Sequence, residues 1–305
     1  MLTANRFQNA PVFHALTDSV GLFVLPSLGH AQEQLSLEAN GITMSYVEEG
    51  TGEPVVFLHG AVADARVWEA IRPLVSDQFH FIALTLRYHG TGDWPDEGGQ
   101  FSTVTHADDV VAFIEALALG PVDVVGWSYG GEVALAAALQ KPDLFKSLVL
   151  YEASLGGLIP EGAAGDAVRE ALDQMLGSVP AALEEGDVEK ATRLLVEGVF
   201  QMEPGGFGSL PQELQDTLLA NARTMPLLWA APPWAVTCEM LGQIDTPTLL
   251  VGGADSNAAF VDLDVIMDEC MPQAERATMP GVNHNGPAVD PVGLAQLIKN
   301  FVASH

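Results

Sequence analysis

The sequence predicts an α/β fold, in which a mostly parallel, twisted sheet carries helices on both faces and is interrupted by a helical insertion. Short apolar runs bounded by turn residues alternate with segments of helical periodicity, and this alternation is typical of strands covered on both sides. It stops near residue 153 and resumes near residue 244. Parallel strands joined by helices form right-handed crossovers, and their ligands bind at the carboxyl ends of the strands.

Strands are predicted where apolar residues run together or alternate with polar residues. The first two runs alternate on either side of Asn40-Gly41, which predicts a hairpin because this dipeptide adopts the tight turn that hairpins need. The later runs are continuously apolar. In chain order, the predicted strands are residues 34–38, 42–48, 54–58, 79–84, 122–127, 147–151, 247–251 and 274–279.

Helices are predicted where apolar residues recur every three or four positions. Thr105 and Asp108 have the spacing of a capping box, which predicts that one helix begins at Thr105. Clusters of Pro and Gly separate the helices expected between residues 153 and 243. In chain order, the predicted helices are residues 64–75, 105–119, 132–140, 166–176, 187–200, 212–222, 262–270 and 291–302.

These patterns divide the chain into an α/β core, residues 34–152 and 244–305, and a helical lid or cap, residues 153–243. Residues 1–33 precede the folded pattern as an N-terminal extension or a weak signal-like segment. An apolar run and the small residues of Gly29-His30-Ala31 are typical of an export signal, but its basic region is poor. We expect a cytoplasmic protein, with export as the alternative if residues 1–31 are a cleaved signal.

The chain is acidic, with 12 basic against 40 acidic residues and a net charge of −28. This charge argues against nucleic acid or an anionic membrane as a partner, because either would be repelled. We expect a small-molecule substrate, no metal and no cofactor, and the oligomeric state is left open. Cys238 and Cys270 lack metal-ligand spacing and lie in different predicted elements, so no disulfide framework is expected.

Residues 126–131, Gly-Trp-Ser-Tyr-Gly-Gly, lie between an apolar strand and a helix of small residues. Small residues on both sides of Ser128 suit a turn too sharp for side chains, and such a turn presents the hydroxyl above the sheet edge. The alternative is a Gly-rich turn in which Ser128 caps the helix.

A serine hydroxyl is a weak nucleophile at neutral pH, so it needs a base and a carboxylate that orients the base. Ser128, Asp255 and His284 each follow an apolar strand, where a parallel sheet places active-site groups. Glu152 follows the strand at residues 147–151 and is the alternative carboxylate.

With its nucleophile turn, its Ser…Asp…His order and His59-Gly60 after an early strand, the chain resembles the α/β-hydrolase superfamily, in its serine-nucleophile, lid-containing branch. The resemblance implies Ser128 as nucleophile, His284 as general base and Asp255 as the orienting acid.

The resemblance also implies an oxyanion hole made by the backbone N–H groups of Ala61 and Tyr129. We expect His59 and Gly60 to support this loop. A serine at the turn, in place of an aspartate, argues against the dehalogenase and epoxide-hydrolase branches, which need a carboxylate nucleophile.

We therefore expect a serine esterase that cleaves a carboxylic ester, lactone or thioester of a small, largely apolar substrate through an acyl-enzyme on Ser128. The candidate pocket residues are Trp127, Trp229 and Trp234. Two alternatives remain: a C–C bond hydrolase or perhydrolase that uses the same triad, and a weakly catalytic ligand-binding receptor of the same fold.

Overall fold

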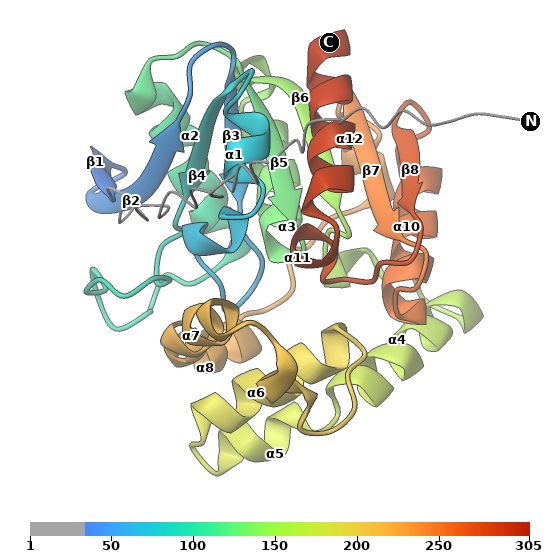
Figure 1. The fold of residues 1–305 in the computed structure, drawn as a ribbon. Coiled ribbons are helices and arrows are strands. Elements are labelled where there is room, and N and C mark those ends of the chain that lie inside the picture. Colours follow the sequence, from blue (N-terminus) through green and yellow to red (C-terminus); the bar gives the residue numbers. More distant parts are fainter. Residues whose placement is uncertain (1–33) are drawn as a thin grey trace, which may run out of the picture. The chain divides into compact units, whose positions relative to one another are not determined.

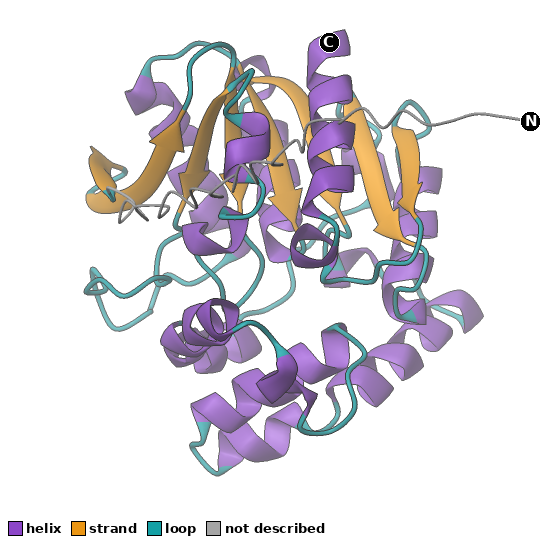
Figure 2. Ribbon diagram, viewed as in Figure 1, coloured by secondary structure: helices purple, strands orange, loops and turns teal. Residues whose placement is uncertain are grey.

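The computed structural model describes residues 34–305 (Figure 1). The extension that the sequence analysis assigned to residues 1–33, with its signal-like segment, lies outside the described residues. The described chain forms one eight-stranded sheet with helices on its two faces. A further group of helices lies beyond the carboxyl ends of the strands (Figure 2). The expected α/β class is confirmed.

The sheet has the strand order β1-β2-β4-β3-β5-β6-β7-β8. β2 pairs antiparallel with both β1 and β4. All the other neighbouring pairs, from β4–β3 to β7–β8, are parallel. β5 lies near the centre of the sheet. The strands are β1 Leu35–Ala39, β2 Ile42–Glu49, β3 Pro54–Leu58, β4 His80–Leu84, β5 Val122–Trp127, β6 Phe145–Tyr151, β7 Thr248–Gly253 and β8 Glu275–Met279.

The alternation of side chains along the strands divides the hydrophobic core between the two faces of the sheet. On β3, Val56 and Leu58 pack in a cluster that includes residues of α2 and α3. Val55 and Phe57 pack in a second cluster that includes residues of α12. This is why the sequence of β3 is continuously apolar: both faces of the strand are covered.

No helix of residues 34–305 has the length and hydropathy needed to cross a bilayer. The helices that cover the sheet come from the segments before and after the helices between β6 and β7. These helices are α1 Arg72–Val75, α2 Thr103–Leu117, α3 Tyr129–Gln140, α10 Ala258–Cys270, α11 Gly286–Val289 and α12 Pro291–Ser304. The short 3₁₀ turns are Ala65–Trp68, Pro142–Leu144, Gly156–Leu158, Gly206–Ser209 and Ala222–Thr224.

Further helices lie between β6 and β7 in the chain, with α4 to α8 in the lower part of Figure 1, and we call them the helical insertion. They are α4 Ala163–Leu176, α5 Val179–Glu184, α6 Val188–Val199, α7 Gln212–Ala220, α8 Met225–Ala230 and α9 Cys238–Leu241. Helix α6 begins where Asp187 caps it, with the carboxylate accepting from the Lys190 N–H at 2.9 Å.

Several helices differ from the sequence prediction in their bounds or were not predicted, and two of the differences have a clear local cause. The helix expected over residues 64–75 is a 3₁₀ turn followed by the single turn α1, with a proline in the first turn of α1. Helix α2 begins at Thr103, because the Ser102 hydroxyl accepts the Thr105 N–H at 3.1 Å and caps the helix. The predicted cap at Thr105 is therefore wrong, and the residue that caps the helix is Ser102, three positions earlier.

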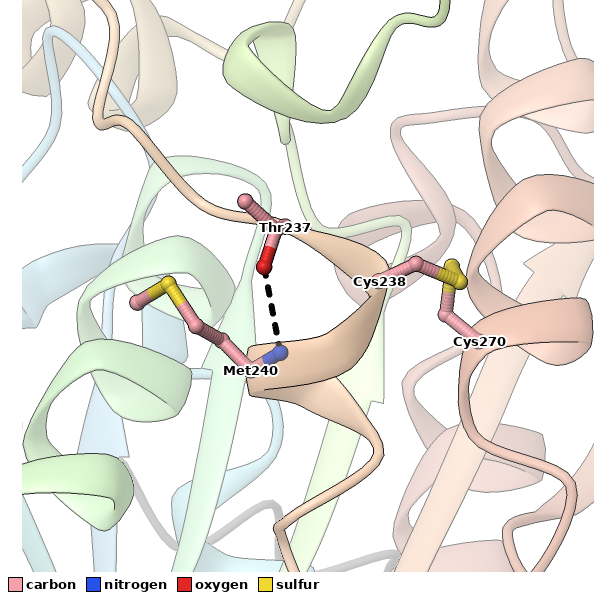
Figure 3. Close-up of a disulfide and its surroundings, with 4 residues drawn as sticks. All are labelled: Thr237, Cys238, Met240 and Cys270. Carbon is pink, nitrogen blue, oxygen red and sulfur yellow. Dashed lines mark hydrogen bonds between the residues drawn. A yellow bond between two sulfur atoms is a disulfide. The ribbon is translucent and has the colours of Figure 1, made fainter.

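A disulfide joins Cys238 of α9 to Cys270 at the end of α10, so the expectation that these cysteines imply no disulfide is wrong (Figure 3). Their Cα atoms are 4.7 Å apart although 32 positions separate them in the chain. The Thr237 hydroxyl accepts the Met240 N–H at 3.2 Å and caps α9, which orients Cys238. The disulfide ties the end of the helical insertion to the core.

We predict that the Cys238→Ser/Cys270→Ser variant is less stable than the oxidised protein by about 3 to 4 kcal/mol, the chain-entropy value for a loop of this length. Urea unfolding followed by circular dichroism measures the difference. The oxidised protein treated with a reductant is the matched control, and it should unfold with the variant. Equal stability of all three forms would show that the disulfide does not constrain the chain.

Candidate active site

The turn between β5 and α3 holds Ser128 in a strained backbone conformation, with φ 54° and ψ −118°. Its hydroxyl makes no cap bond to α3, so the interpretation of Ser128 as a helix cap does not apply. The glycines of the motif are required by close packing: a Cβ on Gly126 would lie 2.7 Å from the Gly130 carbonyl oxygen. A Cβ on Gly130 would clash with the carbonyl oxygens of Leu58 and His59.

His284 lies in the loop after β8 and is held on three sides. Its Nδ1 lies 2.7 Å from Oε2 of Glu152. The Phe260 ring stacks on the imidazole, with centroids 3.8 Å apart and planes 9° apart. The Trp127 indole N–H donates to the His284 carbonyl oxygen at 3.0 Å. Only 2% of His284 is exposed, so the orientation of its ring is well defined.

Glu152 follows β6 and is 1% exposed. Besides the contact with His284, its Oε1 accepts the Gly253 N–H at 2.7 Å and the Ser256 hydroxyl. Because a carboxylate only accepts, His284 Nδ1 carries the proton and Nε2 is left as the acceptor, which is the tautomer a general base needs.

The expectation that Asp255 orients His284 is corrected by this geometry. The Asp255 side chain is exposed, while its backbone N–H donates to Val282 O at 2.9 Å and its carbonyl oxygen accepts from the Gln201 amide. The loop after β7 therefore turns Asp255 outward and supplies the Gly253 N–H to Glu152 instead. The alternative carboxylate of the sequence analysis is the one that contacts the histidine.

The oxyanion-hole candidates, Ala61 and Tyr129, both line the same cavity as Ser128. Within residues 34–305, no protein acceptor takes the backbone N–H of either residue. His59 fixes the loop, because its Nδ1 donates to Gly60 O at 2.8 Å and its Nε2 accepts the Leu86 N–H at 3.0 Å. Burial lowers the pKa of His59, so this imidazole is neutral and supports the loop.

A cavity of about 380 Å³ contains Ser128 and His284 in its wall. Of the predicted pocket residues, Trp127 and Trp229 line it, and Trp229 is 40% exposed. Trp234 does not line the cavity and packs against the core instead. The remaining wall is mainly apolar, and most of its aliphatic side chains come from the helical insertion: Leu172, Met175, Leu176, Leu195, Val196, Val199, Leu218 and Leu228.

Sequence reasoning missed three polar residues of this wall, Thr103, Glu132 and Ser154. The Thr103 hydroxyl donates to Oε1 of Glu132 at 2.7 Å. Burial raises the pKa of Glu132 to about 7, although the hydrogen bond from Thr103 lowers it in part. The spacing of Ser128 and Glu132 on one helix was the only signal of this residue in the sequence.

Asn221 anchors the helical insertion to the core. Its amide donates to Oδ2 of Asp64 at 2.7 Å, and its Oδ1 accepts the Gly90 N–H at 2.6 Å. Burial raises the pKa of Asp64, but hydrogen bonds from Arg66 and Asn221 outweigh it, so the net pKa is lowered and the carboxylate is charged. Asn221 is fully buried, so the anchor is shielded from water.

No group of three potential metal ligands among His, Cys, Asp and Glu is found in residues 34–305. The groups that converge on the cavity are instead those of acyl transfer: a hydroxyl, an imidazole oriented by a carboxylate, and unpaired backbone N–H groups.

Comparisons with known proteins identify the family to which this fold belongs. A model of the alpha/beta hydrolase fold family matches residues 53–291. The 2-(acetamidomethylene)succinate hydrolase of Mesorhizobium japonicum is 26% identical over 275 residues, 86% of this chain and 92% of the relative. The 2-hydroxy-6-oxo-6-(2'-aminophenyl)hexa-2,4-dienoic acid hydrolase of Metapseudomonas resinovorans is 27% identical over 244 residues, 76% of this chain and 79% of the relative.

Among solved structures, a thermophilic esterase from Thermogutta terrifontis superposes with a TM-score of 0.69 at 21% identity, covering 89% of this chain and 98% of the esterase. The chain belongs to the alpha/beta hydrolase fold family, as its resemblance implied. It is a hydrolase of this fold.

A second buried carboxyl, Asp264 of α10, lies beside the catalytic candidates. A Cβ on Gly252 would be 2.6 Å from Asp264 Oδ2 and 4.0 Å from Glu152 Oε1, so the two carboxyl groups flank this glycine. Burial and the charge of Glu152 raise the pKa of Asp264 to about 8. The fold therefore favours the protonated form of Asp264.

We predict that the wild type loses stability as the pH rises, because Asp264 must ionise inside the protein, and that Asp264→Asn does not show this loss. A raised pKa in the folded state means that stability falls as the pH rises from about 4 through 8. The advantage of the variant over the wild type should therefore grow by about 2 kcal/mol or more between pH 5 and pH 8. Urea unfolding at each pH measures it, with the exposed Glu269→Gln on the same helix as control. A constant difference across this range would contradict the burial of Asp264 as a neutral acid.

Proposed function

We propose that this protein is a serine hydrolase that cleaves uncharged carboxylic esters, lactones or thioesters through an acyl-enzyme on Ser128. The observation that carries the proposal is the 2.7 Å contact between His284 Nδ1 and the buried Glu152 carboxylate, in a cavity wall that also contains Ser128. An imidazole with a free Nε2, in the same cavity wall as a strained serine, is the arrangement that can activate a hydroxyl.

In the proposed mechanism, Ser128 Oγ attacks the carbonyl carbon while His284 Nε2 takes the hydroxyl proton. Glu152 stabilises the imidazolium that forms, and the N–H groups of Ala61 and Tyr129 stabilise the oxyanion. The tetrahedral intermediate collapses to the acyl-enzyme, and His284 gives its proton to the leaving alcohol or thiol. Water, deprotonated by His284, then attacks the acyl carbon, and the acid and free Ser128 are released.

The wall of the cavity favours an uncharged substrate. Its lining, drawn from residues 34–305, contains no Lys or Arg, and Glu132 adds a carboxyl. The substrates in the names of the two relatives, a succinate and a dienoic acid, carry carboxylates. A buried carboxylate is bound best by a Lys or Arg side chain, and the described lining of this cavity has neither. This supports ester, lactone or thioester cleavage over the C–C bond cleavage considered from the sequence.

We predict that Ser128→Ala and His284→Ala each lower kcat for p-nitrophenyl butyrate by about 10⁴-fold or more, because each removes a group that acts only with the other. The double variant should be no worse than either single variant. Stopped or continuous release of nitrophenolate measures the rates, with circular dichroism to verify folding. Additive losses would indicate that the two residues act independently.

We predict opposite outcomes for the two candidate acids. Glu152→Gln keeps the shape of the side chain but loses the charge that fixes the His284 tautomer, and kcat should fall by about 10³- to 10⁴-fold. Asp255→Asn, the matched control, should change kcat less than about 3-fold because that carboxylate is exposed. The reverse order of these effects would return the role of acid to Asp255.

A further inference from the structure

Glu132 lies in the first turn of α3, four positions after Ser128, which precedes the helix. Both line the same cavity. A carboxyl group therefore faces the space in which the substrate chain would lie, within reach of a group a few bonds from the reacting carbon.

The protein satisfies only one oxygen of this carboxyl. Oε1 accepts the Thr103 hydroxyl at 2.7 Å, and no other donor of residues 34–305 bonds to Glu132. The nearby Tyr129 hydroxyl is engaged elsewhere, because it bonds to His106 Nδ1 at 2.7 Å. With 8% of Glu132 exposed and that exposure on the cavity, Oε2 is a polar atom that water or a ligand must satisfy.

The fold does not need Glu132. Thr103 is the first residue of α2, and Ser102 already caps that helix. No cation pairs with Glu132 in the part of the chain that the structure describes. A buried carboxyl with one unpaired oxygen costs stability, and a leucine at this position would remove that cost. Such a residue in an apolar cavity is what a binding site for a polar group requires.

The chemistry of Glu132 selects the kind of group. Burial raises its pKa to about 7, so both protonation states are populated near neutral pH. A hydroxyl donates to the ionised form and accepts from the protonated form, so it can pair with either. A carboxylate on the substrate would be repelled by the ionised form.

We propose that the end of the cavity formed by Thr103, Tyr129 and Glu132 is a subsite for a hydroxyl group of the substrate, and that Glu132, oriented by Thr103, selects hydroxylated esters over their unsubstituted analogues. This inference rests on the proposed esterase function and names its substrate class.

Paired esters test the proposal. The acyl pairs are phenyl hexanoate against its 3-hydroxy and 6-hydroxy derivatives, and the alcohol pair is hexyl butyrate against 6-hydroxyhexyl butyrate. The ratio of kcat/KM within each pair cancels general damage to the enzyme. The wild type should prefer the hydroxylated member of at least one pair by about 10-fold, since one hydrogen bond to such a group is worth about 1.4 kcal/mol.

Glu132→Leu should bring that ratio close to one, and Thr103→Val should lower it in part because Glu132 loses its orienting bond. Glu184→Leu, which removes an exposed glutamate of the helical insertion, is the matched control and should keep the wild-type ratio. A wild-type ratio near one in every pair, or a preference that survives Glu132→Leu, would overturn the proposal while ester cleavage itself stood.

If the wild type cleaves none of the esters, the proposed function fails. The hydroxyl subsite is then tested separately, by measuring how tightly each ester binds. Titration calorimetry of the same pairs against Ser128→Ala, which cannot be acylated, should give a 10-fold tighter dissociation constant for a hydroxylated member. The preference should disappear in Ser128→Ala/Glu132→Leu. Equal affinities within every pair would overturn the subsite.

Discussion

The turn between β5 and α3 is the constraint on which the site depends. Ser128 has a positive φ, and backbone bonds hold it there: its N–H donates to Tyr151 O at 2.9 Å, and its carbonyl oxygen accepts the N–H groups of Gly131 at 2.9 Å and Ser154 at 3.2 Å, among others. The close approach of α3 to the end of β3 leaves no space for a side chain at Gly130. The strain is compensated by the surrounding sheet, and the serine lies at the edge where the central strands end.

The neighbouring strands complete the site because parallel strands end at one edge of the sheet. Glu152 follows β6, Gly253 ends β7, and His284 follows β8, and the Glu152 carboxylate accepts hydrogen bonds from both Gly253 and His284. The acid that orients the histidine could follow β6 (Glu152) or β7 (Asp255), and only Glu152 is buried. A carboxylate inside the protein, bonded by two donors, can fix an imidazole, whereas an exposed one is solvated by water.

Local patterns were enough to predict the parallel sheet, the helical group between β6 and β7, and the positions of Ser128 and His284 at strand ends. They were not enough where the outcome depends on which segments meet in space. The pairing of Cys238 with Cys270 needs α9 and α10 side by side. The orientation of Asp255 depends on a loop, and Trp234 turned into the core while Glu132, a surface-type residue by its sequence, turned toward the cavity.

The helical insertion gives the cavity most of its aliphatic wall, and Thr103 of α2 and Glu132 of α3 add polar groups to it. Asn221 and the disulfide attach the insertion to the core at two separate places. In the proposed mechanism, the reacting groups follow strands of the sheet, while the insertion and the first turn of α3 line the space that a substrate would fill.

The most direct test of the account is the reaction of the folded protein with a fluorophosphonate, followed by intact-mass analysis and identification of the labelled peptide. The account predicts one adduct per chain, on Ser128, and its loss in His284→Ala, because a serine is phosphonylated only when a base activates it. A folded wild-type protein that forms no adduct, or one that is labelled at another residue, would contradict the assignment of Ser128 as the nucleophile.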